Sequence, residues 1–216
     1  MDQFPQTELA VEAVRFARRA EAPAIFNHSM RTYLYGRFLG ERRGWRAGLD
    51  YDDELLFLGC VLHDIGLSEE GDGDQSFDID GADLAARFLT DQGVSADRVE
   101  VVWDAIALHL CFEVAQRKRP EIALVTLGAG YDLGPNRDHP LPEGYAERVH
   151  AEFPRLHGAA ALHKAIVDQA LAKPQKAPPF TLPGELVRQT TGAQWPTWHD
   201  LMAREPSWND HVGWPG

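Results

Sequence analysis

Apolar side chains recur every three or four residues along most of residues 7–172, which is the periodicity of helices that bury one face. No segment shows the regular alternation of apolar and polar residues that indicates a half-buried strand. Thr7 suits a helix N-cap and Pro23 suits a first helical turn. The pattern therefore predicts an all-α protein. The predicted helices cover residues 7–20, 23–39, 53–66, 81–89, 96–114, 122–127, 143–152 and 156–172.

The helix predicted at 53–66 is apolar almost all round, which is typical of a helix in the middle of a core. Gly66 is placed to end it, so His63 and Asp64 are expected in its last turn. A histidine and an aspartate at the end of a buried helix could hold a metal ion inside the core.

The character of the chain changes after Lys173. Four prolines follow, at Pro174, Pro178, Pro179 and Pro183, and then four of the six tryptophans, at Trp195, Trp198, Trp208 and Trp214. Because disordered tails are poor in aromatic residues, we expect 174–216 to be an irregular tail packed on a single domain formed by 1–173. As lesser alternatives, the tail could line a lid or form a subunit contact, so a homo-oligomer is possible. A shorter acidic stretch, 68–74, is expected to be a mobile loop near the site, and Asp80 after it a solvated or capping residue.

The composition, with 44% hydrophobic and 25% charged residues in a chain of 216, is that of a soluble globular domain. The net charge of -12 repels phosphate backbones and anionic lipids, so we expect a small-molecule substrate and neither a nucleic-acid nor a membrane partner. Cys60 and Cys111 are too few for a disulfide framework and are expected to be buried thiols. The sequence opens without a signal-like segment, which favours a cytoplasmic location.

Four side chains have the chemistry of a core metal site. His28, His63, Asp64 and Asp132 would supply two imidazoles and two carboxylates from three predicted helices or helix ends. Nitrogen and oxygen ligands suit zinc, iron(II), manganese or nickel, and the sequence does not choose among them. Such an ion lowers the pKa of a bound water to about 7, which allows attack on an electrophilic carbon or phosphorus at neutral pH.

The order of these residues, His, then His-Asp, then Asp, resembles that of the HD-domain family of metal-dependent hydrolases over about residues 25–160. One branch of the family, the cyanamide-hydratase-like proteins, is similar in several segments at once. These segments are Phe26-Asn27-His28-Ser29-Met30-Arg31, Leu62-His63-Asp64-Ile65-Gly66, Phe77-Asp78-Ile79-Asp80-Gly81-Ala82, Ala107-Leu108-His109 and Gly130-Tyr131-Asp132. The resemblance implies a helical HD-domain bundle with His28, His63, Asp64 and Asp132 as metal ligands. It also implies zinc as the metal and the hydration of cyanamide to urea as the reaction.

The resemblance also implies roles for single residues. HD proteins with two metals usually carry a further histidine before the segment that here reads Gly81-Ala82, and its absence predicts one divalent ion. Asp64 would orient the attacking water as well as bind the metal, and His109 would give or relay a proton.

Two further residues are candidates for substrate binding. The related hydratases carry hydroxyl residues directly after the His-Asp motif, whereas this chain reads Leu67-Ser68 there. This departure leaves only the Ser68 hydroxyl to orient the substrate, and it allows a substrate other than cyanamide. Arg31, three residues after His28 on the same helix face, would pair with a site carboxylate unless it is a surface residue.

Two other functions fit the same ligands. An HD phosphohydrolase acting on a nucleotide or another phosphate monoester would need basic residues converging beside the metal. The candidates are Arg31, Arg42, Arg43, Arg117 and Arg137. A non-catalytic binding module would use the metal only for stability and would keep it in a closed site. The cavity beside the metal distinguishes these three functions. A small apolar pocket favours hydration, an arginine-lined cleft favours a phosphate ester, and a closed site favours the binding module.

Overall fold

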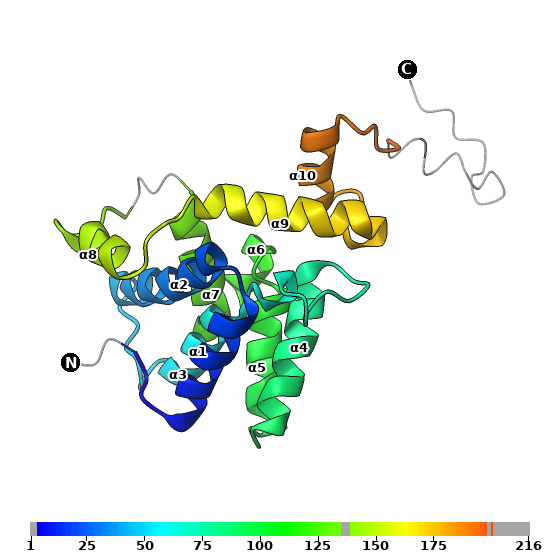
Figure 1. The fold of residues 1–216 in the computed structure, drawn as a ribbon. Helices are drawn as coiled ribbons and strands as arrows, with labels where there is room; N and C mark the ends of the chain where they lie inside the picture. The colour runs from blue at the N-terminus through cyan, green and yellow to red at the C-terminus, as the bar shows by residue number, and fades with distance from the viewer. Residues whose placement is uncertain (1–3, 135–138, 198–199, 201–216) are drawn as a thin grey trace, which may run out of the picture.

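The computed structural model describes residues 4–134, 139–197 and 200, and within these ranges it contains helices and no β-strand (Figure 1). The helices are α1 (Glu8–Ala20), α2 (Pro23–Arg42), α3 (Asp53–Leu62), α4 (Phe77–Asp91), α5 (Ala96–Ala107), α6 (Phe112–Ala115), α7 (Pro120–Leu133), α8 (Tyr145–Glu152), α9 (Gly158–Ala172) and α10 (Leu182–Thr191). The short 3-10 turns η1 (Ile65–Leu67) and η2 (Pro174–Lys176) follow α3 and α9. The predicted all-α fold is confirmed. None of the helices that the structure describes is both long and apolar enough to cross a membrane.

Three helix ends differ from the prediction around the motifs. The helix α3 ends at Leu62, so His63 is its C-cap and Gly66 lies in η1 rather than at a helix end. The helix α5 ends at Ala107, which places His109 in the turn before α6. The helix α7 runs on to Leu133, so that Asp132 lies inside it. At two of these ends the side chain of a histidine reaches back to the backbone: the Nδ1 atoms of His63 and His109 lie 2.8 and 2.6 Å from the carbonyl oxygens of Cys60 and Ile106. Such side-chain hydrogen bonds compete with those of a continuing helix.

The helices α2 and α7 pack most extensively of all pairs, and two glycines allow them to come close. A Cβ atom on Gly128 would lie 2.2 Å from the Thr32 carbonyl oxygen, and one on Gly36 would lie 3.0 Å from the Leu124 carbonyl oxygen. His28 lies one turn before Thr32, and Asp132 lies one turn after Gly128. The close crossing therefore brings the side chains of these two residues together.

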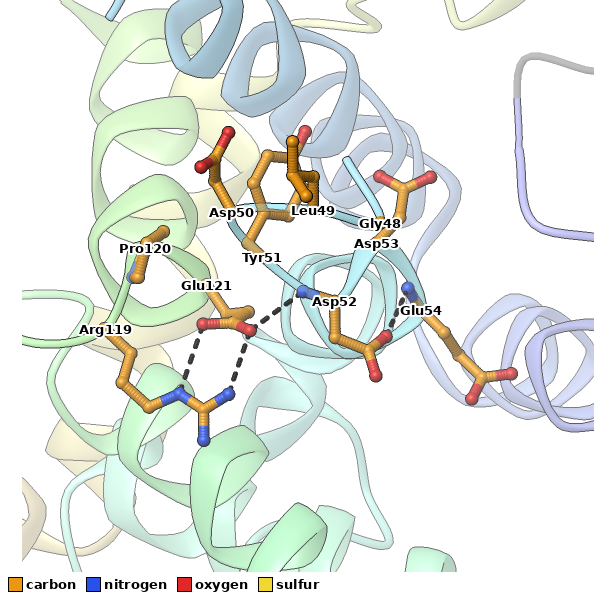
Figure 2. A pocket seen from close by; sticks show the side chains of 10 residues that line it. All are labelled: Gly48, Leu49, Asp50, Tyr51, Asp52, Asp53, Glu54, Arg119, Pro120 and Glu121. Atoms are coloured by element: carbon orange, nitrogen blue, oxygen red, sulfur yellow. Dashed lines mark hydrogen bonds and ion pairs between the residues drawn. The ribbon is translucent and has the colours of Figure 1, made fainter. Parts of the chain in front are cut away.

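The helix α3 is buried along its whole apolar length, as its sequence predicts, and it packs on α1, α2, α5 and α7. Its first turn is fixed to α7 by the buried Glu121, whose carboxylate accepts hydrogen bonds from the Asp52 backbone and from Arg119 (Figure 2). Asp52 in turn caps α3 by accepting from the backbone N–H groups of Glu54 and Leu55. Anchoring the start of α3 in this way fixes the position of its other end, where His63 and Asp64 follow.

The segment after Lys173 is more regular than predicted. Thr181 caps α10, and Pro183 falls in its first turn, where a proline is tolerated. The helix α10 stands on the end of α9, which lies across the bundle (Figure 1). Trp195 packs on a small separate cluster formed by Val167, Ala170, Ala177 and Val187. The other tail tryptophans, Trp198, Trp208 and Trp214, lie outside the described residues.

The acidic loop 68–74 is held by several contacts to the segment that follows α9. Lys176 is 2% exposed and pairs with Asp80 and Asp72, while Lys173 donates to the Asp72 carbonyl oxygen. Asp80 is thus buried and ion-paired, which corrects the expectation of a solvated or capping residue. The loop joins the end of η1 to the start of α4, and these pairs tie it to the tail.

Candidate metal centre

Three histidines from separate elements surround the carboxylate of Asp64. His28 comes from α2, His63 from the end of α3 and His109 from the turn after α5, and all four side chains are buried. The Nε2 atoms of His28 and His63 lie 3.3 Å apart, and they lie 3.7 Å and 3.2 Å from Asp64 Oδ2. His109 Nε2 lies 3.9 Å from Asp64 Oδ1. The four donors form one cluster inside the core.

The hydrogen bonds of the Nδ1 atoms decide which way these histidines present their lone pairs. The Nδ1 atom of His63 lies 2.8 Å from the Cys60 carbonyl oxygen, and that of His109 lies 2.6 Å from the Ile106 carbonyl oxygen. The Nδ1 atom of His28 lies 2.7 Å from Asp132 Oδ2. Because carbonyl and carboxylate oxygens accept hydrogen bonds, each Nδ1 must be the donor. In the neutral form each Nε2 therefore carries a lone pair that faces Asp64.

A divalent cation fits this arrangement. Bonds of about 2.0–2.2 Å to four tetrahedral ligands give ligand-to-ligand distances of about 3.3–3.6 Å. The three distances among His28, His63 and Asp64 are close to these values. Asp64 Oδ2 is buried and has no hydrogen-bond partner among the described residues. Two facing lone pairs and a free carboxylate oxygen are stabilised by a cation between them. His28, His63 and Asp64 are the residues placed to hold one.

Asp132 lies behind His28 and away from the three donors that face each other. Its carboxylate accepts from His28 Nδ1 and from Arg31, whose Nε and NH2 atoms lie 2.8 and 2.7 Å away. Arg155 adds an ion pair at 3.4 Å. A carboxylate behind a metal-binding histidine fixes the orientation of the ring and makes its other nitrogen more basic. The structure thus gives Asp132 a positioning contact, and direct ligation of the metal by Asp132 stays a prediction.

Arg31 is fully buried and is not a surface arginine. It pairs with the carboxylate of Asp132, which agrees with the expectation of an ion pair with a site carboxylate. Its NH1 atom donates to the carbonyl oxygens of Phe153 and Pro154. Every polar end of the guanidinium is therefore directed at the protein. Arg31 does not line the pocket described below, so substrate binding by Arg31 stays a prediction without a contact to support it.

The ionisable groups of the cluster shift one another's pKa values. Burial raises the pKa of Asp64, but the three histidines outweigh burial and hold the pKa well below its ordinary value. Burial lowers the pKa of His63, yet the Asp64 carboxylate leaves it above its ordinary value. Burial and the neighbouring His63 together lower the pKa of His109 to about 4. The His109 ring is therefore neutral at pH 7, and its Nε2 atom carries a lone pair.

Ser68 is buried beside η1, and its hydroxyl is occupied on both sides. It donates to the Ile65 carbonyl oxygen at 2.6 Å and accepts from the Gly71 backbone at 3.1 Å. Ser68 does not line the pocket. Its position is that of a residue that closes the loop 68–71, and substrate binding by Ser68 stays a prediction.

A pocket of about 400 Å³ opens beside the cluster, with His28, His63, Asp64 and His109 in its wall. The rest of its described lining is apolar or small, except for His163. These residues are Phe77, Leu110, Phe112, Ala129, Gly130, Leu133, Gly134, Ala159, Leu162, Ile166, Leu182 and Leu186. The candidate metal site therefore opens into a cavity, whereas a purely structural site would be closed.

The arginines that a phosphohydrolase would need do not gather here. Arg31, Arg42, Arg43 and Arg117 are all absent from the described lining of the pocket, which includes no lysine or arginine. Arg137 lies outside the residues that the structure describes.

Three features of the structure were not foreseen. Glu21, the C-cap of α1, is 6% exposed and neither carboxylate oxygen has a hydrogen-bond partner in the described structure. Burial, and then the charge of Asp64, raise the pKa of Glu21 well above its ordinary value. Cys111 is exposed, because α5 ends before it, although its apolar neighbours predict burial. The pocket wall from α10 was also missed, and its only sequence signal is the spacing of Leu182 and Leu186, four residues apart.

The sequence matches the model of the HD domain over residues 25–144, more than half of the chain, and the protein belongs to the HD-domain family. HD domains are metal-dependent hydrolases that bind divalent ions, and His28, His63 and Asp64 are the described residues that could hold such an ion here. Two proteins of Saccharomyces cerevisiae, cyanamide hydratase DDI2 and cyanamide hydratase DDI3, are similar to this chain. Each is 23% identical over 174 residues, which cover 79% of this chain and 76% of the relative.

Proposed function

We propose that this protein is a hydratase that uses one divalent metal ion, zinc in the first instance, to add water to the carbon of a nitrile-type substrate such as cyanamide. The observation that carries the proposal is the pocket. It reaches the metal-binding side chains, and its described lining contains no basic residue. A phosphate ester would bring at least one negative charge into this wall without an arginine or lysine to meet it. A neutral nitrile needs no such partner. The similarity to the yeast cyanamide hydratases supports the same choice.

The ion, when bound, supplies a water that is acidic enough to be ionised near neutral pH. The side chains around it then have separate tasks. Asp132 holds the ring of His28 through Nδ1, and the Cys60 carbonyl oxygen holds the ring of His63 in the same way. Asp64 is within reach of all three Nε2 atoms, so it sets the charge of the cluster as well as offering a ligand oxygen.

His109 is the candidate for proton transfer. Its Nδ1 hydrogen is committed to Ile106, so Nε2 is the atom that takes a proton. The low pKa of His109 makes the protonated ring a strong acid, which passes the proton on to the substrate nitrogen. The water oxygen bonds to the nitrile carbon and gives up one proton to His109 Nε2, one carbon–nitrogen π bond breaks, and His109 passes that proton to the nitrogen. The product tautomerises to a urea.

The test is urea formation from cyanamide by the zinc-loaded protein, with His63→Ala and His139→Ala prepared in parallel. His139 is half-buried, and its only described hydrogen bond is through its backbone carbonyl oxygen, so its variant is a matched histidine control. We expect urea with the wild type and His139→Ala and none with His63→Ala. Hydrolysis of a phosphate monoester without urea formation would overturn the proposal.

A further inference from the structure

The pocket is much larger than the smallest substrate that the proposed chemistry needs. Cyanamide has three heavy atoms, whereas a cavity of 400 Å³ falls in the range of about 300–1,000 Å³ that encloses drug-sized ligands. The residues that hold the metal occupy only part of the wall. A compact substrate would leave most of this space to water against apolar side chains, which is unfavourable.

The wall beyond the metal-binding residues is apolar and comes from several helices. Leu110 and Phe112 lie before and within α6, while Leu162 and Ile166 come from α9. The side chains of Leu162 and Ile166 are both buried, so the α9 side of the pocket is well packed. The one further titratable group in the described wall is His163, and its Nε2 atom lies 2.8 Å from the Thr190 hydroxyl. The wall offers an occupant apolar contact and little hydrogen bonding.

Small residues widen the pocket on two sides. Ala129, Gly130 and Gly134 line it from α7 and its end, and Ala159 lines it from α9. A Cβ atom on Gly130 would lie 3.0 Å from the Phe112 ring, so glycine makes room for that ring. Several large apolar side chains of the wall remain partly open to solvent, among them Phe112 at 49% and Leu133 at 47% exposed. An apolar ligand would cover them.

We infer that the substrate is an apolar-substituted nitrile or cyanamide, with its carbon–nitrogen group at the metal centre and an uncharged alkyl or aryl substituent in this pocket. The inference rests on the proposed function for the reacting group and on the pocket for the substituent. For a monosubstituted cyanamide, R–NH–C≡N plus water gives R–NH–CO–NH2, so the product is an N-substituted urea and no further reactant is needed.

The experiment compares cyanamide with N-methyl, N-propyl and N-pentyl cyanamide as substrates of the zinc-loaded protein. Binding of the matching N-alkyl ureas is measured separately by calorimetry. Each methylene that leaves water for an apolar wall favours binding by about fourfold. We expect kcat/KM to rise and the Kd of the urea to fall by about this factor per methylene, giving more than a hundredfold between methyl and pentyl.

Two alanines on α9 offer a matched pair of variants. Ala159 and Ala160 are adjacent and both exposed, but only Ala159 lines the pocket. Ala159→Phe fills the pocket and is expected to reduce the gain from methyl to pentyl by at least tenfold, whereas Ala160→Phe leaves it unchanged.

The outcomes separate the two claims. Hydration of cyanamide with no gain from the longer substituents overturns the inference and leaves the proposed function standing. Failure to hydrate any of the compounds overturns the proposed function. In that case the urea affinities decide, because a gain with chain length that Ala159→Phe removes supports the apolar subsite, and equal affinities overturn it.

Discussion

Replacing Arg31 by methionine is expected to cost about 3 kcal/mol of folding free energy. The guanidinium is fully buried and donates to both oxygens of Asp132, at 2.8 and 2.7 Å. Methionine keeps most of the apolar volume but leaves the buried carboxylate without its main partner. Removing one member of a buried ion pair costs about 3–5 kcal/mol, and we take the lower value because Arg155 remains 3.4 Å from the carboxylate. This is a large part of the about 5–15 kcal/mol that stabilises a typical domain.

The assay is urea unfolding followed by far-UV circular dichroism at pH 7, with a chelator present so that metal binding does not contribute. Arg155→Met is the matched control. Arg155 donates to the Asp132 carbonyl oxygen at 2.7 and 3.0 Å, but its side chain is 46% exposed, so we expect its loss to cost about 1 kcal/mol. Equal costs for the two variants would refute the reasoning.

A double variant locates the effect. Asp132→Asn removes the charge that Arg31→Met leaves unpaired, so it should cost much less in the Arg31→Met background than in the wild type. We expect a coupling free energy of at least about 2 kcal/mol. Additive costs would mean that Arg31 stabilises the protein through its contacts with Phe153 and Pro154 and not through Asp132.

Three further predictions follow from the described packing and charge. Gly128→Ala places a Cβ atom 2.2 Å from the Thr32 carbonyl oxygen, so it should destabilise the protein by about 2 kcal/mol or more in the same assay. Gly158→Ala, where nothing lies closer than 3.5 Å, should cost little. Glu21→Gln should stabilise the metal-free protein increasingly as pH rises from about 4.5, because the pKa of Glu21 is raised on folding. The folded state then binds more protons than the unfolded state, so wild-type stability is lost at about 1.4 kcal/mol per pH unit until the folded pKa is reached. If Glu21→Gln and the wild type were equally stable at pH 7, the burial of Glu21 would not destabilise the protein. His109→Asn should lower kcat for cyanamide by about a hundredfold or more while metal content stays at the wild-type value, and loss of the metal would instead make His109 a ligand.

The parts of the site that local patterns determine could be predicted from the sequence. The apolar run of residues 55–62 predicts a buried helix that carries His63 and Asp64 at its end, and the structure contains this buried helix, α3, with both residues directly after it. The family motifs pointed to His28 from a distance of 35 residues along the chain, and the structure places its Nε2 atom 3.3 Å from that of His63.

The parts that depend on how helices cross could not be predicted. The position of Asp132 behind His28 depends on the close approach of α2 and α7 at Gly36 and Gly128, which no periodicity reveals. His109 lies in the turn after α5 because that helix ends at Ala107, although the apolar pattern of the sequence continues beyond this residue. The pocket wall from α10 arises because that helix stands on α9, a contact between segments that sequence reasoning treated as domain and tail.

Metal content is the most direct test of the central claim that His28, His63 and Asp64 hold one divalent ion. Elemental analysis of the purified protein after reconstitution with zinc and removal of unbound ion should give about one equivalent for the wild type and for His139→Ala. The same treatment of His63→Ala should leave far less than one equivalent, although the variant remains folded by circular dichroism. Equal metal in all three proteins, or none in the wild type, would contradict the account.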